Sequence, residues 1–125
     1  MIDYFDEIEL IIYFKNTSEK TEKEITKKLK NVLKEFPGLT FYTDAKADNI
    51  TEEIPREKHA IVVNINDNER KFHVKTVLDK VCSFIETLPD VDYFQGSVYA
   101  PAVVEASIKQ KGKTEYEIEV KDFYY

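Results

Sequence analysis

Two short stretches of the chain are strongly apolar in their interiors. They run from Glu7 to Lys15 (EIELIIYFK) and from Lys58 to Asn66 (KHAIVVNIN). Each is too short for a typical buried helix and is followed by turn-forming residues, so both predict β-strands with covered faces. A third, shorter strand is predicted from Leu39 to Asp44 (LTFYTD), because this segment is rich in strand-forming residues.

Two longer segments carry apolar residues at helical spacing. The first begins at a capping box, Thr21 to Glu24, with Ser18 as the alternative cap, and it ends at Pro37-Gly38. The second predicted helix spans Glu69 to Leu88 and is stopped by Pro89. In the first helix the apolar positions recur at offsets of 4, 7, 8 and 11, which forms one core-facing side: Ile25, Leu29, Val32, Leu33 and Phe36.

The last third of the chain alternates as strands do. Even-numbered positions in the range 98–108 are all apolar, and they stay in phase across Pro101. We therefore predict one long strand that is bent or bulged at the proline, preceded by a connection from Asp90 to Gly96. Lys111-Gly112 predicts a hairpin tip, and Thr114 to Asp122 predicts the final strand.

The predicted element order is β-α-β-β-α-β-β within a single domain of residues 1–125. The first six elements resemble a ferredoxin-like split βαβ unit, in which the first and third strands are central. These are also the two most apolar strands of the chain. The sequence thus predicts an α+β fold with a five-stranded, mainly antiparallel sheet. Both helices lie on one face, and an extra C-terminal strand forms a hairpin.

The second face of this sheet carries no helix in such an architecture. Ile11, Tyr13, Val62 and Tyr42 are expected there, covered either by the chain itself or by a second copy. Asn64 falls on the same face and is expected to be half exposed. RNA-recognition domains read bases on this face, but the apolar third strand lacks their glycine and spaced aromatics. Nucleic acid is therefore not an expected partner.

The cluster Asn66-Asp67-Asn68-Glu69 stands where a strand turns into the second helix. A calcium loop needs further oxygen ligands, a glycine and a distant glutamate, and a phosphate cradle needs glycines. None of these accompanies the cluster. Asn66 and Glu69 instead have the spacing of a helix cap, so we interpret the cluster as capping and expect no cofactor or metal.

Composition and candidate chemistry narrow the class of protein. The net charge is −6, with 42% hydrophobic residues. The single Cys82 fits a reducing compartment, and neither a signal peptide nor an apolar run of membrane-spanning length is visible. Cytoplasmic location without membrane contact is therefore expected. His59 and His73 are isolated, and Cys82 lies near the apolar side of its helix, so no enzyme is predicted.

Two surfaces depart from an even mixture of charges. The segments 1–9 and 115–125 combine aromatic and acidic residues, and their candidate partner-binding residues are Tyr4, Phe5, Asp6, Glu117, Glu119, Phe123, Tyr124 and Tyr125. The alternative is a lysine stripe along the first helix, formed by Lys20, Lys23, Lys27, Lys30 and Lys34.

The leading functional hypothesis is a non-enzymatic interaction protein that occupies a partner protein with a basic surface. Inhibitors, immunity proteins and accessory proteins of mobile elements are the kinds of protein meant. The alternative is a small self-associating regulatory or assembly domain. It would pair as a homodimer through the second sheet face, with or without a small ligand. A third hypothesis is anion binding by the lysine stripe.

Overall fold

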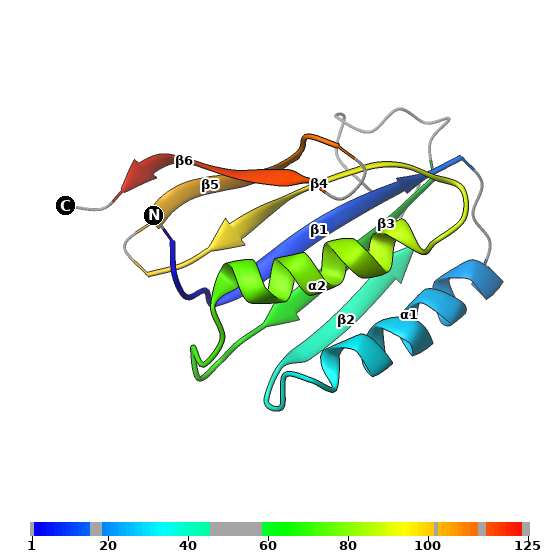
Figure 1. Cartoon of the computed structure of the whole chain (residues 1–125), viewed down its shortest axis with the longest axis horizontal. Helices are drawn as coiled ribbons and strands as arrows, with labels where there is room; N and C mark the ends of the chain where they lie inside the picture. Colours follow the sequence, from blue (N-terminus) through cyan, green and yellow to red (C-terminus); the bar gives the residue numbers. More distant parts are fainter. Residues whose placement is uncertain (1, 16–18, 46–58, 102, 113–114, 124–125) are drawn as a thin grey trace.

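The computed structural model of the chain describes residues 2–15, 19–45, 59–101, 103–112 and 115–123. Within these residues it has six strands and two helices (Figure 1). In chain order they are β1 (Glu7–Phe14), α1 (Glu19–Leu33), β2 (Thr40–Ala45), β3 (His59–Asn66), α2 (Val74–Glu86), β4 (Val91–Tyr99), β5 (Val103–Gln110) and β6 (Tyr116–Phe123).

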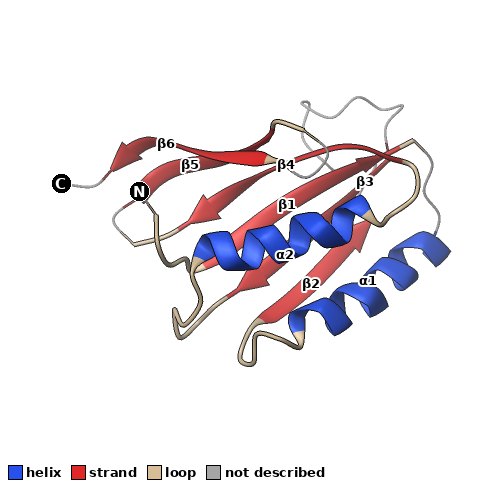
Figure 2. Cartoon of the chain, viewed as in Figure 1, coloured by secondary structure: helices blue, strands red, loops and turns tan. Residues whose placement is uncertain are grey.

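The six strands form one sheet in the order β2-β3-β1-β4-β5-β6, and every ladder is antiparallel. Both helices lie on the same face of this sheet (Figure 2). The predicted α+β class is confirmed, and the two most apolar strands, β1 and β3, are interior as expected. The full ferredoxin-like arrangement with one added strand is not matched, because the strand count and order differ from the five-stranded prediction.

The additional strand comes from the region between the second helix and Lys111. The predicted connection Asp90–Gly96 is mostly strand β4, and the predicted single strand across Pro101 is the two paired strands β4 and β5. Gln95 pairs with Lys109 and Ser97 with Ser107. Each such pair has residue numbers of the same parity, so even-numbered residues occupy one face on both sides of the turn. The alternation therefore continues through a hairpin as it would through a bent strand.

The main core lies between the helices and the sheet. On β1 the even-numbered side chains from Ile8 to Phe14 are buried there, and on β3 the odd-numbered ones from Ile61 to Ile65. Helix α2 contributes seven buried residues, and α1 contributes Ile25, Leu29 and Leu33. The apolar residues whose helical spacing predicted the two helices are thus largely the residues that the helices bury in the core.

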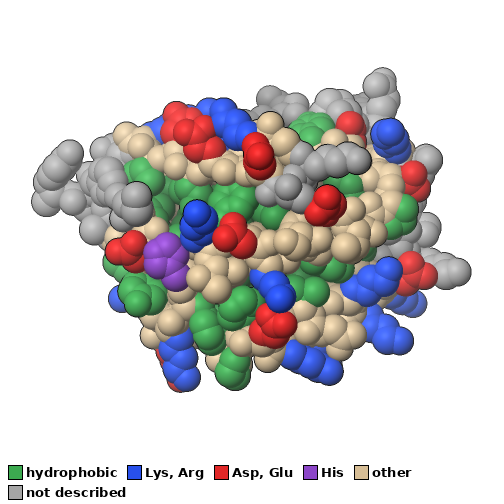
Figure 3. All heavy atoms as spheres, in the orientation of Figure 1, with side chains coloured by type: hydrophobic (Ala, Val, Ile, Leu, Met, Phe, Trp, Pro, Cys, Tyr) green, Lys and Arg blue, Asp and Glu red, His purple; other side chains and the backbone are tan. Residues whose placement is uncertain are grey.

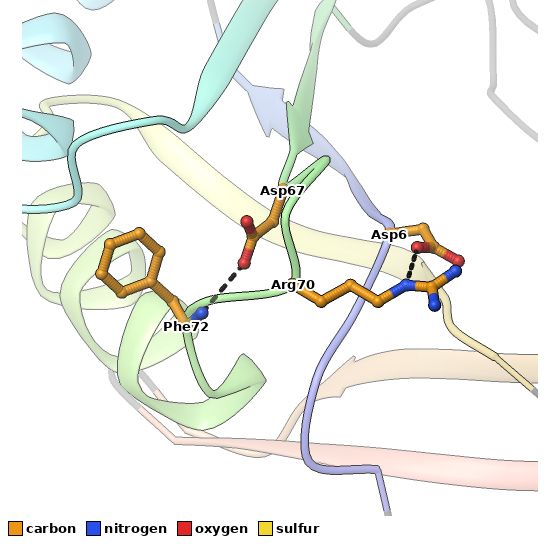
Figure 4. Close-up of polar contacts among 4 residues, drawn as sticks. All are labelled: Asp6, Asp67, Arg70 and Phe72. Carbon is orange, nitrogen blue, oxygen red and sulfur yellow. Dashed lines mark hydrogen bonds and ion pairs between the residues drawn. The ribbon is translucent and has the colours of Figure 1, made fainter.

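The polar cluster after β3 does not cap the second helix as predicted. Helix α2 begins at Val74, and its N-cap is His73, whose Nδ1 accepts a hydrogen bond of 3.1 Å from the Lys75 amide. Asp67 is 1% exposed and holds the preceding loop instead, because its Oδ2 accepts a bond of 3.0 Å from the Phe72 amide (Figure 4). Arg70, with a φ of 52°, reverses the chain between them.

Candidate functional site

The sheet face opposite the helices is here called the open face. It carries a row of mostly polar side chains that the sequence did not predict. The strand registers place six side chains in one row across all six strands of this face. From one edge to the other this central row reads Tyr42, Asn64, Glu9, Ser97, Ser107 and Glu119. Neighbouring members are direct cross-strand partners, so their Cβ atoms are about 4.5–5.5 Å apart.

Asn64, the second member of this row, is buried. It is 4% exposed rather than half exposed as the sequence predicted. Its Oδ1 and the Oγ of Ser107 are buried and have no hydrogen-bond partner within the described part of the chain. A buried polar atom without a partner loses its bonds to water and gains nothing in return, which destabilises the fold.

Two carboxylates of β1, Glu7 and Glu9, flank this position on the open face. Both are half buried, and in the described ranges neither forms an ion pair. Partial burial raises the pKa of the Tyr99 phenol, and the negative charges of Glu9 and Glu7 raise it further, against a hydrogen bond with Ser97 that lowers it. The carboxylates and the phenol therefore share one electrostatic environment.

Exposed aromatic rings stand on both sides of these carboxylates. Tyr42 on β2 is 55% exposed and Tyr99 on β4 is 48% exposed. The predicted apolar character is confined to the other end of the open face. There the Tyr13 and Tyr93 rings stack at 4.3 Å, and Gln95 donates a hydrogen bond of 2.8 Å to the Tyr13 hydroxyl.

The predicted N-terminal binding residues lie elsewhere, beside the start of α2. Phe5 is 0% exposed and belongs to the main core, so it does not face a partner in this structure. Tyr4 is half exposed, and its backbone forms an isolated antiparallel β-bridge with His73. Asp6 is already paired, because its Oδ1 lies 2.6 Å from Nε of Arg70 (Figure 4).

The predicted C-terminal acids lie on the open face, but lysines of the same molecule pair with them. Glu119 lies 2.6 Å from Lys109, and Glu117 lies 3.2 Å from Lys111. The hydrogen bond and charge of Lys109 lower the pKa of the Glu119 carboxyl. Phe123 ends β6 with its side chain outside the described part, and Tyr124 and Tyr125 lie outside the described residues.

The lysine stripe is present on the outer side of α1. Lys23, Lys27, Lys30 and Lys34 are exposed, and the side chain of Lys20 is not among those described. Figure 3 shows basic side chains gathered along the side of the molecule where α1 lies. Lys23, Lys27 and Lys30 lie within α1 and Lys34 directly follows it. The function of the stripe stays a prediction.

A groove of about 740 Å³ opens between Ile2, the first half of α2 and the β5–β6 hairpin. Tyr116 at its wall donates a hydrogen bond of 2.7 Å to Asp79. Its rim mixes basic Lys75 and Lys111 with acidic residues, so it presents no charge preference. Cys82 on α2 is buried, and this burial, together with the charge of Asp79, raises the pKa of its thiol to about 12. That thiol is protonated at neutral pH and is a poor nucleophile.

The described residues contain no group of three or more His, Cys, Asp or Glu side chains arranged to hold a metal ion. None of their helices combines the length and apolar character needed to cross a bilayer. The chain matches no protein-family model, no curated protein and no solved structure at a significant level. The sequence predicted this face but not the central row across it, because strand pairing, not local spacing, brings those side chains together.

Proposed function

We propose that this chain is a protein-binding domain that receives a basic surface of a partner on the open face of its sheet. The observation that carries the proposal is the pair of half-buried carboxylates, Glu7 and Glu9, which lack an ion-pair partner in the described part of the chain. Other acids nearby, such as Asp6 and Glu119, already have cations of their own.

The neighbourhood of these carboxylates suits protein recognition. Tyr42 on β2 and Tyr99 on β4 are exposed on either side of β3 and β1, and tyrosine offers a large contact area with little loss of side-chain entropy. Unpaired carboxylates between such rings select a positively charged partner and speed its approach. Pairing of two copies through this face is the alternative, and it would need cations of the second copy opposite Glu7 and Glu9.

The lysine stripe is the weaker candidate for the same role. Its lysines are exposed along one helix, and immobilising such side chains costs more entropy than immobilising tyrosines. Lysine is also depleted in the cores of protein interfaces. We propose that the domain acts in the cytoplasm as an inhibitor, immunity or accessory protein, a role consistent with its acidity and its single buried Cys82.

A basic peptide tests the proposal without knowledge of the natural partner. The probe is an eight-residue peptide of alternating serine and lysine, added at low salt, with NMR shifts of the labelled protein as the readout. We expect the shifts to map to β1, β2, β3 and β4, and the affinity to fall as salt screens the charges.

The matched variants are E7Q/E9Q on the open face and E22Q/E24Q on α1, which remove the same charge. Binding should weaken markedly only in the first variant. Shifts that map to the helices, or equal weakening in both variants, contradict the proposal.

A further inference from the structure

Three neighbours in the central row point to one kind of side chain on the partner. Asn64 lies between Tyr42 on one side and Glu9 on the other, each its direct cross-strand partner. Together they bring a carboxylate, an amide oxygen without a donor and an exposed aromatic ring onto adjacent positions of one sheet face.

We propose that these three residues form a subsite for an arginine side chain of the partner protein, an inference that rests on the function proposed above. A guanidinium is planar and has five N–H donors and no acceptor. Two donors match the Glu9 carboxylate side by side, and a third serves the Asn64 Oδ1. The flat face of the guanidinium then packs on the Tyr42 ring.

The state of Asn64 is what separates this site from a general acidic patch. Asn64 is only 4% exposed, yet its Oδ1 receives no hydrogen bond from the described residues. An amide in this position is unfavourable for the free protein and becomes satisfied when an N–H donor arrives. Because Oδ1 is buried, the arginine reaches it only when a neighbouring side chain moves aside.

Lysine serves the same site less well. An ammonium is a compact, strongly hydrated charge, and its three donors diverge rather than lie in one plane. It pairs with Glu9 as a point charge but does not offer the flat surface that stacks on Tyr42. The subsite therefore distinguishes arginine from lysine at equal charge, which a purely electrostatic surface does not.

The test compares two peptides of equal length and charge, one alternating serine with arginine and the other alternating serine with lysine. Affinities are measured by calorimetry, and the side-chain amide signal of Asn64 is followed by NMR. We expect the arginine peptide to bind about tenfold more tightly, the effect of one hydrogen bond to a charged group. The Asn64 amide signal should shift with the arginine peptide and much less with the lysine peptide.

The variants are Asn64→Val, which removes the acceptor, and Tyr42→Leu, which removes the ring. Each should lower the affinity for the arginine peptide by more than the affinity for the lysine peptide, so that the ratio of the two affinities falls. Equal binding of both peptides by the natural chain, or full arginine preference in Asn64→Val, overturns the arginine subsite while the basic-partner proposal stands. Failure of both peptides to bind at low salt overturns the two proposals together.

Discussion

The hydroxyl of Tyr116 on β6 donates a hydrogen bond of 2.7 Å to the carboxylate of Asp79 on α2. This bond ties the last strand to the helix layer, 37 residues away in sequence. Partial burial and the Asp79 carboxylate, which accepts the bond and is negatively charged, raise the pKa of the phenol well above its usual value. The folded state therefore holds this proton more firmly than the unfolded state does.

Replacement of Tyr116 by phenylalanine should lower the free energy of unfolding by about 1 kcal/mol at neutral pH, because the bond to Asp79 is lost. Because the pKa of the Tyr116 phenol is higher in the folded state, the phenol stabilises the folded protein fully at pH values below its unfolded pKa of about 10. This stabilisation is lost as pH rises through the folded pKa. Urea unfolding at several pH values from 7 to 11 measures the difference. It should shrink in alkali for Tyr116→Phe but not for the exposed control Tyr42→Phe, and a pH-independent difference contradicts the explanation.

Gly96 on β4 is a position where a side chain does not fit. A Cβ there would overlap the carbonyl oxygen of Glu9 and lie 3.0 Å from Cδ2 of Leu10. Both neighbours belong to the interior strand β1, whose backbone is fixed by ladders on two sides. We expect Gly96→Ala to lower the free energy of unfolding by about 3 kcal/mol, the upper part of the range for overpacking.

The matched control for that substitution is Gly112→Ala in the β5–β6 hairpin. A Cβ at Gly112 would lie 3.6 Å from Cβ of Glu115, which is ordinary contact. Its effect on the urea midpoint should be small. Similar losses at the two glycines would mean that the close approach of β4 to β1 is not what demands glycine.

The loop before α2 should depend on one carboxylate. Asp67→Ala leaves the Phe72 amide without its bond to Oδ2, and we expect a loss of about 2 kcal/mol in unfolding free energy. Asp67→Asn keeps an acceptor at that position and should lose less. The exposed neighbour Asn68 is the control, and Asn68→Ala should change little. Equal effects of Asn68→Ala and Asp67→Ala in thermal unfolding would contradict the assigned role of Asp67.

The apolar continuity of β1 and β3 predicted their interior positions, because a strand covered on both faces has few polar positions. The β4–β5 hairpin was not predicted, since its register preserves the parity of the alternation. The helix cap was placed too early because histidine is not a favoured N-cap residue, and His73 gave no signal. Local pattern therefore found most elements and misjudged their ends.

The candidate site was less accessible to sequence reasoning than the fold. The sequence shows acidic residues near both chain ends, but whether they are free to bind a partner depends on cations far away in sequence. Arg70 pairs with Asp6 across 64 residues, whereas Glu9, three residues further along, has no such cation in the described ranges. Phe5 appeared to belong to an acidic surface, yet it is core because the chain turns it toward the helices. Only the tertiary structure distinguishes the paired Asp6 and the buried Phe5 from the carboxylate of Glu9.

Asn64 should be a position where a substitution stabilises the fold. Asn64→Val removes a buried amide oxygen that has no donor among the described residues and introduces a side chain that strands favour. We expect the free energy of unfolding to rise by about 1 kcal/mol, at the lower end of the penalty for a buried polar group without a partner. Urea unfolding measures the gain. The control is Asn66→Val on the same face, where the side chain is half exposed and the gain should be smaller.

A residue that destabilises the free protein and improves partner binding shows opposite effects in two measurements. If Asn64 serves the arginine subsite, Asn64→Val is more stable than the natural chain and binds the arginine peptide less tightly. Such a trade between stability and activity is expected where a site holds groups that only a ligand satisfies. A less stable Asn64→Val variant would show that the amide already has its bonds in the folded protein. The arginine subsite would then lose the observation on which it was built.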